Sequence, residues 1–296
     1  MSLGMRIVFF GLVGTISGLI AWPCAEIILF FQAKFPTLLF FNAALGATIG
    51  LFMGGCFGTT EGILARSPNA ARSGAVTGIG VGIAGGLVGF VAGQAALLFI
   101  GTTLFSSMRS FQQFGFPLSR AIGWAVFGIF IGSVEGIRGG SLSKVRNGII
   151  GGFIGGIVGG VGVEYTRYLS PASFYARLVG LLILGFMIGM FYGFIENRLT
   201  KASLCLLNGR QRGREFLLSQ KVTRVGGSDI TEVGVRGYKG VDPFHAEIKR
   251  DREGYLLTNA GTKKGMWVND SRTEEGRLTD GDVIRIGDAQ FRFTEK

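Results

Sequence analysis

The first two thirds of the chain contain almost no acidic residues. Residues 1–203 hold no aspartate and only five glutamates, and glycine interrupts their long apolar runs. From residue 204 onward the sequence is densely charged. The two parts of the chain must therefore be solvated differently, which indicates two domains of different class.

Histidine and cysteine are also scarce. The chain has one histidine, His245, and no HExxH motif, and no glycine-rich loop carries the Lys-Ser or Lys-Thr of a phosphate-binding turn. Cys24, Cys56 and Cys205 lie in or beside apolar segments without metal-ligand spacing, so we expect small buried hydrophobic residues rather than redox or metal ligands. We therefore predict neither an enzyme nor a protein with a metal or cofactor.

The apolar runs are long enough to cross a membrane. A hydrocarbon core of about 30 Å requires about 20 mostly apolar residues per helix. The first and third runs are overlong, so we expect them to tilt or break, the first at Pro23. We predict an all-α membrane domain over residues 1–199 with six spans near residues 7–32, 38–64, 74–105, 121–137, 148–166 and 178–197.

Basic residues indicate how these spans are oriented. The formal net charge of +11 is concentrated beside the spans, which favours a role at the membrane surface and no nucleic-acid partner. The positive-inside rule then predicts that the N- and C-termini of this multi-pass protein are both cytoplasmic. We expect it in a bacterial-type inner membrane, with the lipid bilayer as one of its partners. The side with more positive charge carries Arg6, Arg66, Arg72, Arg138, Lys144, Arg146, Arg198, Lys201, Arg210, Arg212 and Arg214, and the other side carries Lys34, Arg109, Arg120, Arg167 and Arg177.

An internal repeat runs through the membrane part at an offset of 74 residues. Spans two, four and six share the signature GxxxGxxE, and span one is the weakest copy, with only Gly14 and Gly18 in the same spacing. We therefore expect a glycine-rich bundle of three helix pairs, one-two, three-four and five-six. The candidate packing glycines are Gly54, Gly58, Gly74, Gly78, Gly82, Gly128, Gly132, Gly148, Gly152, Gly156, Gly189 and Gly193.

Glycine at every fourth position leaves one helix face without side chains. Such a face lets two backbones approach closely where lipid gives no hydrophobic drive for helix pairing. We favour a tightly packed bundle, which would also allow a homo-oligomer, and keep glycine-lined helices around a pore as the alternative.

Glu61, Glu135 and Glu196 continue the glycine faces at the cytoplasmic end. Three such carboxylates could form a polar ring that attracts cations in a pore. The alternative, which we favour, is that each glutamate lies at headgroup level and forms an ion pair. The nearby arginines are Arg66, Arg138 and Arg198.

The tail changes to short segments of period two separated by turn clusters. This pattern predicts a small soluble all-β sandwich over residues 214–296, joined to the membrane domain by a basic linker at 200–213. The predicted strands cover residues 216–218, 245–249, 254–258, 266–268, 283–286 and 291–293.

The order of landmarks in the tail resembles a forkhead-associated (FHA) domain. Val225-Gly226 stands where that family begins its Ile-Gly-Arg turn, and His245-Ala246 ends a Ser-Arg-x-His-Ala-like segment. The run from Gly265 to Asn269 is similar to the end of Ser-x-Asn-Gly-Thr-x-Val-Asn, and the run from Leu278 to Gly287 is close to the family's last hairpin. The resemblance implies a domain that binds phosphothreonine peptides on loops at one end of the sandwich.

The departures from the family pattern fall on the phosphate contacts. The family arginine is matched by Gly227, the serine before the histidine by Asp242, and the asparagine that holds the peptide backbone by Lys264. The family role of His245 is to support the loop from within. Losing guanidinium donors and gaining a carboxylate both oppose anion binding. The candidate peptide-binding residues are Gly227, Ser228, Arg236, Lys239, Asp242, Thr262, Lys263 and Lys264.

Together these features predict an integral membrane anchor that presents an FHA-like interaction module to a cytoplasmic protein, phosphorylated or not, through a non-standard or phosphate-independent mode. The alternative is a channel or transporter regulated by the FHA-like domain.

Overall fold

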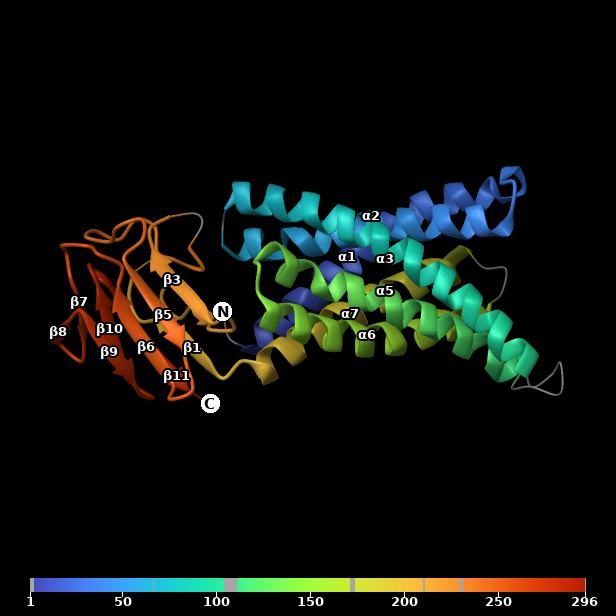
Figure 1. The fold of residues 1–296 in the computed structure, drawn as a ribbon. Coiled ribbons are helices and arrows are strands. Elements are labelled where there is room, and N and C mark those ends of the chain that lie inside the picture. The colour runs from blue at the N-terminus through green and yellow to red at the C-terminus, as the bar shows by residue number, and fades with distance from the viewer. Residues whose placement is uncertain are drawn as a thin grey trace. The chain divides into compact units, whose positions relative to one another are not determined.

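The computed structural model describes residues 3–65, 67–103, 111–170, 174–209, 211–228 and 231–295. The chain divides into two compact units, one of Ile7–Glu196 and one of Asn197–Lys296 with Met1–Arg6. The first unit is helical and the second is built from strands (Figure 1).

Six long helices are apolar enough to cross a membrane, which confirms the predicted spans. Thr37 and Ser141 cap two of them, because each hydroxyl accepts a hydrogen bond from the backbone N–H three residues later. Short helices η1 (Gln32–Lys34) and η2 (Phe111–Gly115) precede α2 and α5. The long helices are α1 (Leu3–Phe30), α2 (Leu38–Leu64), α3 (Pro68–Thr103), α5 (Phe116–Arg138), α6 (Leu142–Leu169) and α7 (Phe174–Leu199).

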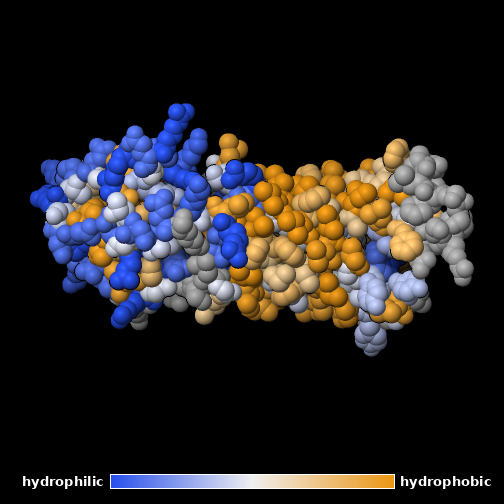
Figure 2. All heavy atoms as spheres, turned by 90° about the horizontal axis from the view of Figure 1, so that it is seen from below, coloured by the Kyte–Doolittle hydropathy of each residue, from blue (hydrophilic) through white to orange (hydrophobic). Residues whose placement is uncertain are grey.

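Helix α1 continues through Pro23 and does not break there, contrary to the sequence-based expectation. A proline removes one backbone hydrogen bond, and neighbouring helices in a bundle can compensate that loss. The outer surface of the helical unit is covered by apolar side chains, as Figure 2 shows for one face. This surface suits contact with lipid.

Glycine seams hold the helices together in pairs. In α2 and α3, Gly54 lies against Gly78 and Gly58 against Gly74, and a Cβ added at any of the four would come closer than 3.0 Å to backbone atoms. Side chains are therefore excluded from this seam.

Two further seams repeat this arrangement. Gly128 and Gly132 of α5 lie against Gly152 and Gly148 of α6, and Gly185 of α7 lies against Gly14 of α1. These seams join α2 with α3, α5 with α6 and α7 with α1. Glycines also lie between two of the predicted pairs, since Gly89 of α3 lies against Gly123 of α5 and Gly155 of α6 lies against Ile188 of α7. That the three helix pairs repeat one unit stays a prediction. The remaining candidates also lie in seams: Gly82 against Gly50, Gly156 against Trp124, Gly189 against Phe10 and Gly193 against Ile7.

Large side chains fill the space between the helices. Met53 and Phe57 of α2 pack with Phe127 and Ile131 of α5 and Leu184 of α7 in one buried cluster. Cys24, Cys56 and Cys205 were expected to be buried, but they are free and half-buried. For the two cysteines of the bundle the reason is that every helix also has an outward face, so a residue in an apolar run need not be buried.

The tail is a β-sandwich of two sheets. One sheet has the order β2-β1-β11-β10-β7-β8 and the other β4-β3-β5-β6-β9. The predicted strands agree with β2, β5, β6, β7, β10 and β11 to within two residues, and the other strands were not predicted. The strands are β1 (Ala202–Leu206), β2 (Glu215–Leu217), β3 (Val222–Gly226), β4 (Val233–Gly234), β5 (Ala246–Arg250), β6 (Tyr255–Asn259), β7 (Met266–Val268), β8 (Ser271–Thr273), β9 (Glu275–Leu278), β10 (Val283–Ile286) and β11 (Ala289–Glu295).

Strand β1 lies within residues 200–213, the segment expected to be a linker. It pairs antiparallel with both β11 and β2, and Leu204 lies opposite Phe293 and Phe216. Its alternation is only a few residues long and directly follows a spanning helix, so sequence alone gave no strand signal. The sandwich therefore begins at Ala202 rather than at residue 214.

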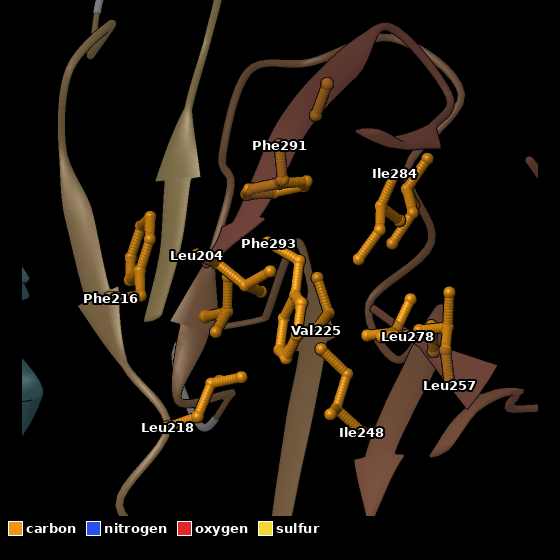
Figure 3. Packing of buried hydrophobic residues seen from close by; sticks show 14 of the residues in the cluster. Leu204, Phe216, Leu218, Val225, Ile248, Leu257, Leu278, Ile284, Phe291 and Phe293 are labelled. Carbon is orange, nitrogen blue, oxygen red and sulfur yellow. The ribbon is translucent and has the colours of Figure 1, made fainter. Parts of the chain in front are cut away.

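The two sheets enclose one hydrophobic core. Figure 3 shows Leu204, Phe291 and Phe293 from one sheet facing Val225 and Ile248 from the other. Inward residues alternate with outward ones along each strand, as in β11, where Phe291 and Phe293 are fully buried. This core fixes the ends of the strands from which the loops emerge.

Candidate functional site

Three loops meet at one end of the sandwich. Strand β3 ends at Gly226, β5 begins at Ala246, and β6 ends at Asn259, and the antiparallel pairing of these neighbours brings the three points to the same edge. We call the loops that leave this edge the apical loops: residues 227–228, 235–245 and 260–265. They carry all eight candidate peptide-binding residues.

An ion pair links two of the apical loops. The Lys264 ammonium lies 2.6 Å from Oδ1 of Asp242. This hydrogen bond first, and one from the Thr262 hydroxyl second, lowers the pKa of the Asp242 carboxyl below its ordinary value of 3.8. Asp242 is therefore ionised at neutral pH, and Lys264 of the same domain neutralises its charge.

His245 supports this pair from below. Its ring is fully buried, the backbone N–H of Asp242 donates to its Nδ1 at 3.2 Å, and its Nε2 lies 2.9 Å from the carbonyl oxygen of Gly265. Because Nδ1 accepts, Nε2 carries the proton and donates to Gly265. The side chain thus joins the two loops from within, as the family resemblance implies.

Asn259 shapes the third loop. Its Nδ2 donates to the carbonyl of Thr262 at 3.0 Å, and its Oδ1 accepts from the N–H of Thr262 at 3.1 Å. The Thr262 hydroxyl in turn accepts from the N–H of Lys264 at 3.1 Å. These bonds fix the turn from which Lys264 reaches Asp242.

Gly227 and Ser228 join the site through their backbones. The Gly227 N–H donates to the carbonyl of Asp242 at 2.9 Å, and the Ser228 N–H donates to that of Pro243 at 3.2 Å. A Cβ at Gly227 would meet its nearest atoms, two carbonyl oxygens, at 3.8 Å. The fold therefore leaves room for a side chain at the position where the FHA family has its arginine.

The other candidates lie further from the ion pair or point to solvent. Lys239 is held through its carbonyl, which accepts from the N–H of Asp288 in the β10–β11 hairpin at 2.9 Å. The side chains of Arg236, Lys239 and Lys263 are exposed. Phe244 lies on the same loop as Asp242, is 43% exposed and was not predicted from the sequence, because a lone apolar residue in a loop carries no periodic signal.

A second polar cluster lies in the helical unit. Arg138 contacts Glu61 at 2.8 Å and Glu135 at 3.2 Å, and Lys144 contacts Glu61 at 2.5 Å. The Thr60 hydroxyl donates to Glu135 at 2.7 Å. Glu61 and Glu135 thus share Arg138 as a partner. For these two residues the contacts agree with the ion-pair hypothesis rather than with an open polar ring.

The third glutamate of the signature, Glu196, is buried near the end of α7. Arg66 lies outside the described residues. At other positions of the bundle, Arg177 contacts Glu26 at 2.6 Å, and Arg120 contacts Glu164 at 3.5 Å. Within the described residues no group of three potential metal ligands comes together.

The fold and its loops define the class: a bundle of membrane-spanning helices followed by an FHA-like β-sandwich. A family model described as the inner membrane component of T3SS, cytoplasmic domain, matches residues 205–296. A curated relative, an oxoglutarate dehydrogenase inhibitor from Corynebacterium jeikeium, is 29% identical over 92 residues, which are 31% of this chain and 63% of the relative. The chain thus spans less than two thirds of that relative's length.

Solved FHA domains are similar to the same part of the chain. One comes from a structural and functional analysis of phosphothreonine-dependent FHA domain interactions, with 29% identity, 33% of this chain and 98% of that chain covered, and a TM-score of 0.30. Another is the FhaA FHA domain complexed with the intracellular domain of Rv3910, with 29% identity, 31% and 98% covered, and a TM-score of 0.29.

Proposed function

We propose that this chain is a bacterial inner-membrane scaffold that acts by binding rather than by catalysis. Its FHA-like domain faces the cytoplasm and holds a protein partner on the apical loops without requiring phosphothreonine. The observation that carries this proposal is the ion pair between Lys264 and Asp242 at the place where FHA domains bind phosphate.

The charges of the loops support a phosphate-independent mode. A phosphate needs cationic donors in a fixed geometry, and Gly227 supplies no side chain where the family has its arginine. Lys264 is engaged by Asp242, whose own negative charge would repel a phosphate placed nearby. What remains is a preorganised turn, exposed amines and the exposed Phe244 ring. Such a surface suits an acidic and apolar partner segment.

The family match and the charge bias support the membrane setting. The matched model describes a cytoplasmic domain of an inner-membrane component, and the basic residues beside the spans favour the same side for both termini. A scaffold role follows because the helices would hold the sandwich close to the membrane, where a recruited partner becomes locally concentrated.

Copurification of the full-length chain tests the proposal. The chain is isolated in detergent from its native membrane with bound proteins, and half of the sample is treated with a protein phosphatase. We expect the partner to stay bound after treatment, and we expect Phe244→Ala or Lys264→Ala to weaken its retention. Lys221→Ala is the matched control, because Lys221 is an exposed amine next to the opposite end of β3. Release of the partner by the phosphatase would overturn the proposal.

The channel or transporter alternative has less support. Phe57, Phe127 and Ile131 pack in one buried cluster between the helices, and Arg138 and Lys144 neutralise the Glu61 carboxylate. In reconstituted protein we expect Glu61→Gln, Glu135→Gln and Glu196→Gln to lower thermal stability without changing ion flux. A selective change in flux with stability unaltered would favour the channel.

A further inference from the structure

A patch of arginines lies on the outer face of the sheet that contains β1. Arg292 is paired with Cys205 and Val283, and Arg285 with Gln290 and Trp267. Paired residues of neighbouring strands share a face, and the alternate residues of these strands, such as Phe291 and Ile284, point into the core. We call the outward residues Trp267, Arg272, Arg285 and Arg292 the arginine face. Glu215 lies in the same outward row as Arg292, on the far side of Cys205.

The three arginines of this face form no ion pair within the part of the chain that the structure describes, where no carboxylate lies within ion-pair distance of Arg272, Arg285 or Arg292. The opposite sheet differs, since Arg224 lies 3.7 Å from Glu247 and Arg277 lies 3.1 Å from Asp251. Three arginines without an ion pair on one face indicate an external anionic partner.

Trp267 gives this face a second property. The guanidinium of Arg285 lies 4.4 Å from the centre of the Trp267 ring, and both side chains are half-buried. Arg272 and Arg292 flank this stack and are exposed. Arginines around an indole ring have the chemistry of the membrane–water interface, where tryptophan is enriched and arginine contacts phosphate groups.

The covalent connection limits the distance of this sheet from the membrane. Helix α7 ends at Leu199 and β1 begins at Ala202, so two residues separate a spanning helix from the first strand of the same sheet. Two extended residues reach only about 7 Å. The arginine face is therefore carried by the sheet that is tied to the bilayer.

We propose that the arginine face docks on anionic lipid headgroups at the surface of the membrane that the helices span. Each arginine near an anionic bilayer raises the docked population about fivefold, and salt reduces this gain. The arginine face lies on the strands, and only Arg272 borders an apical loop, beside Gly265. The proposal can therefore be tested without a bound partner.

Cysteine labelling of the full-length chain tests this proposal. In a Cys24→Ala, Cys56→Ala, Cys205→Ala background, Gln290→Cys places one thiol beside Arg285 on the arginine face, and Val222→Cys places one on the opposite sheet. Each protein is reconstituted in nanodiscs of phosphatidylcholine with or without phosphatidylglycerol. The rate of modification by a polar maleimide is then measured at low and high salt.

We expect phosphatidylglycerol to slow labelling at position 290 by at least about fivefold at low salt, and high salt to restore it. Adding Arg272→Gln, Arg285→Gln and Arg292→Gln should abolish the protection, while labelling at position 222 stays constant in every sample. Equal labelling rates at position 290 in both lipids would overturn the proposal. If both rates were low compared with position 222, the protection would come from a protein contact and not from anionic lipid.

Discussion

Lys264 and Asp242 form an ion pair of 2.6 Å between two loops that are 22 residues apart in sequence. The pair closes over the buried His245, whose ring accepts from the backbone of Asp242 and contacts the carbonyl of Gly265. The FHA-like fold thus keeps the support of its loop end, while internal opposite charges occupy the place of the phosphate contacts.

The first prediction concerns the titration of Asp242. The hydrogen bond from Lys264 lowers the pKa of this carboxyl below 3.8, so the pair stabilises the folded loops above that pH and is lost as the pH falls through the lower folded value. Lys264→Ala should raise the pKa of Asp242 toward 3.8. Carboxyl NMR of the full-length chain with labelled aspartate measures it, because aspartate occurs only in the tail. A pKa that Lys264→Ala leaves unchanged would contradict the pairing.

The second prediction concerns the glycine seams. A Cβ at Gly54 would come closer than 3.0 Å to backbone atoms of α3, so Gly54→Ala must push the two helices apart. We expect a loss of about 1–3 kcal/mol in the free energy of unfolding, and a similar loss for Gly132→Ala in the α5–α6 seam. Gly80→Ala is the control, because nothing lies within 4 Å of the added atom. Thermal unfolding in detergent compares the three variants, and equal effects of Gly54→Ala and Gly80→Ala would refute close packing.

The third prediction concerns Arg138. This side chain is shared by Glu61 and Glu135, and the Glu135 side chain is only 2% exposed. Removing one partner of a buried ion pair costs about 3–5 kcal/mol because a charge is left uncompensated. Arg138→Gln should therefore destabilise the helical unit far more than Arg146→Gln, which removes an exposed charge from α6. If denaturant unfolding shows the same stability for both variants, the cluster does not hold the helices together.

Much of the fold could be predicted from the sequence because its signals are local. Apolar runs set the spans, and α2 begins and ends where predicted, at Leu38 and Leu64. Strand β1 was missed because its five residues follow a spanning helix and gain their order from β11 and β2. A repeat in sequence does not say which neighbouring helix each glycine face contacts, so the contact between Gly14 of α1 and Gly185 of α7 was not predicted.

The site was predictable only in part. The resemblance located the loops and the departures at Gly227, Asp242 and Lys264, but no rule of spacing joins Asp242 to Lys264. That contact depends on the turn set by Asn259 and on the backbone at His245, which only the folded loops bring together. Phe244 was not predicted because a lone apolar residue in a loop carries no periodic signal.

The most direct test of the central claim is a titration with phosphothreonine peptides and their unphosphorylated twins. Wild-type full-length protein and the variant Gly227→Arg, Asp242→Ser, Lys264→Asn, which restores the family residues, are compared by calorimetry in detergent. The account predicts that wild type binds both forms of each peptide equally, and that the variant prefers the phosphorylated form about tenfold or more, since charged hydrogen bonds are regained. Preference for the phosphorylated form by the wild-type protein would contradict it.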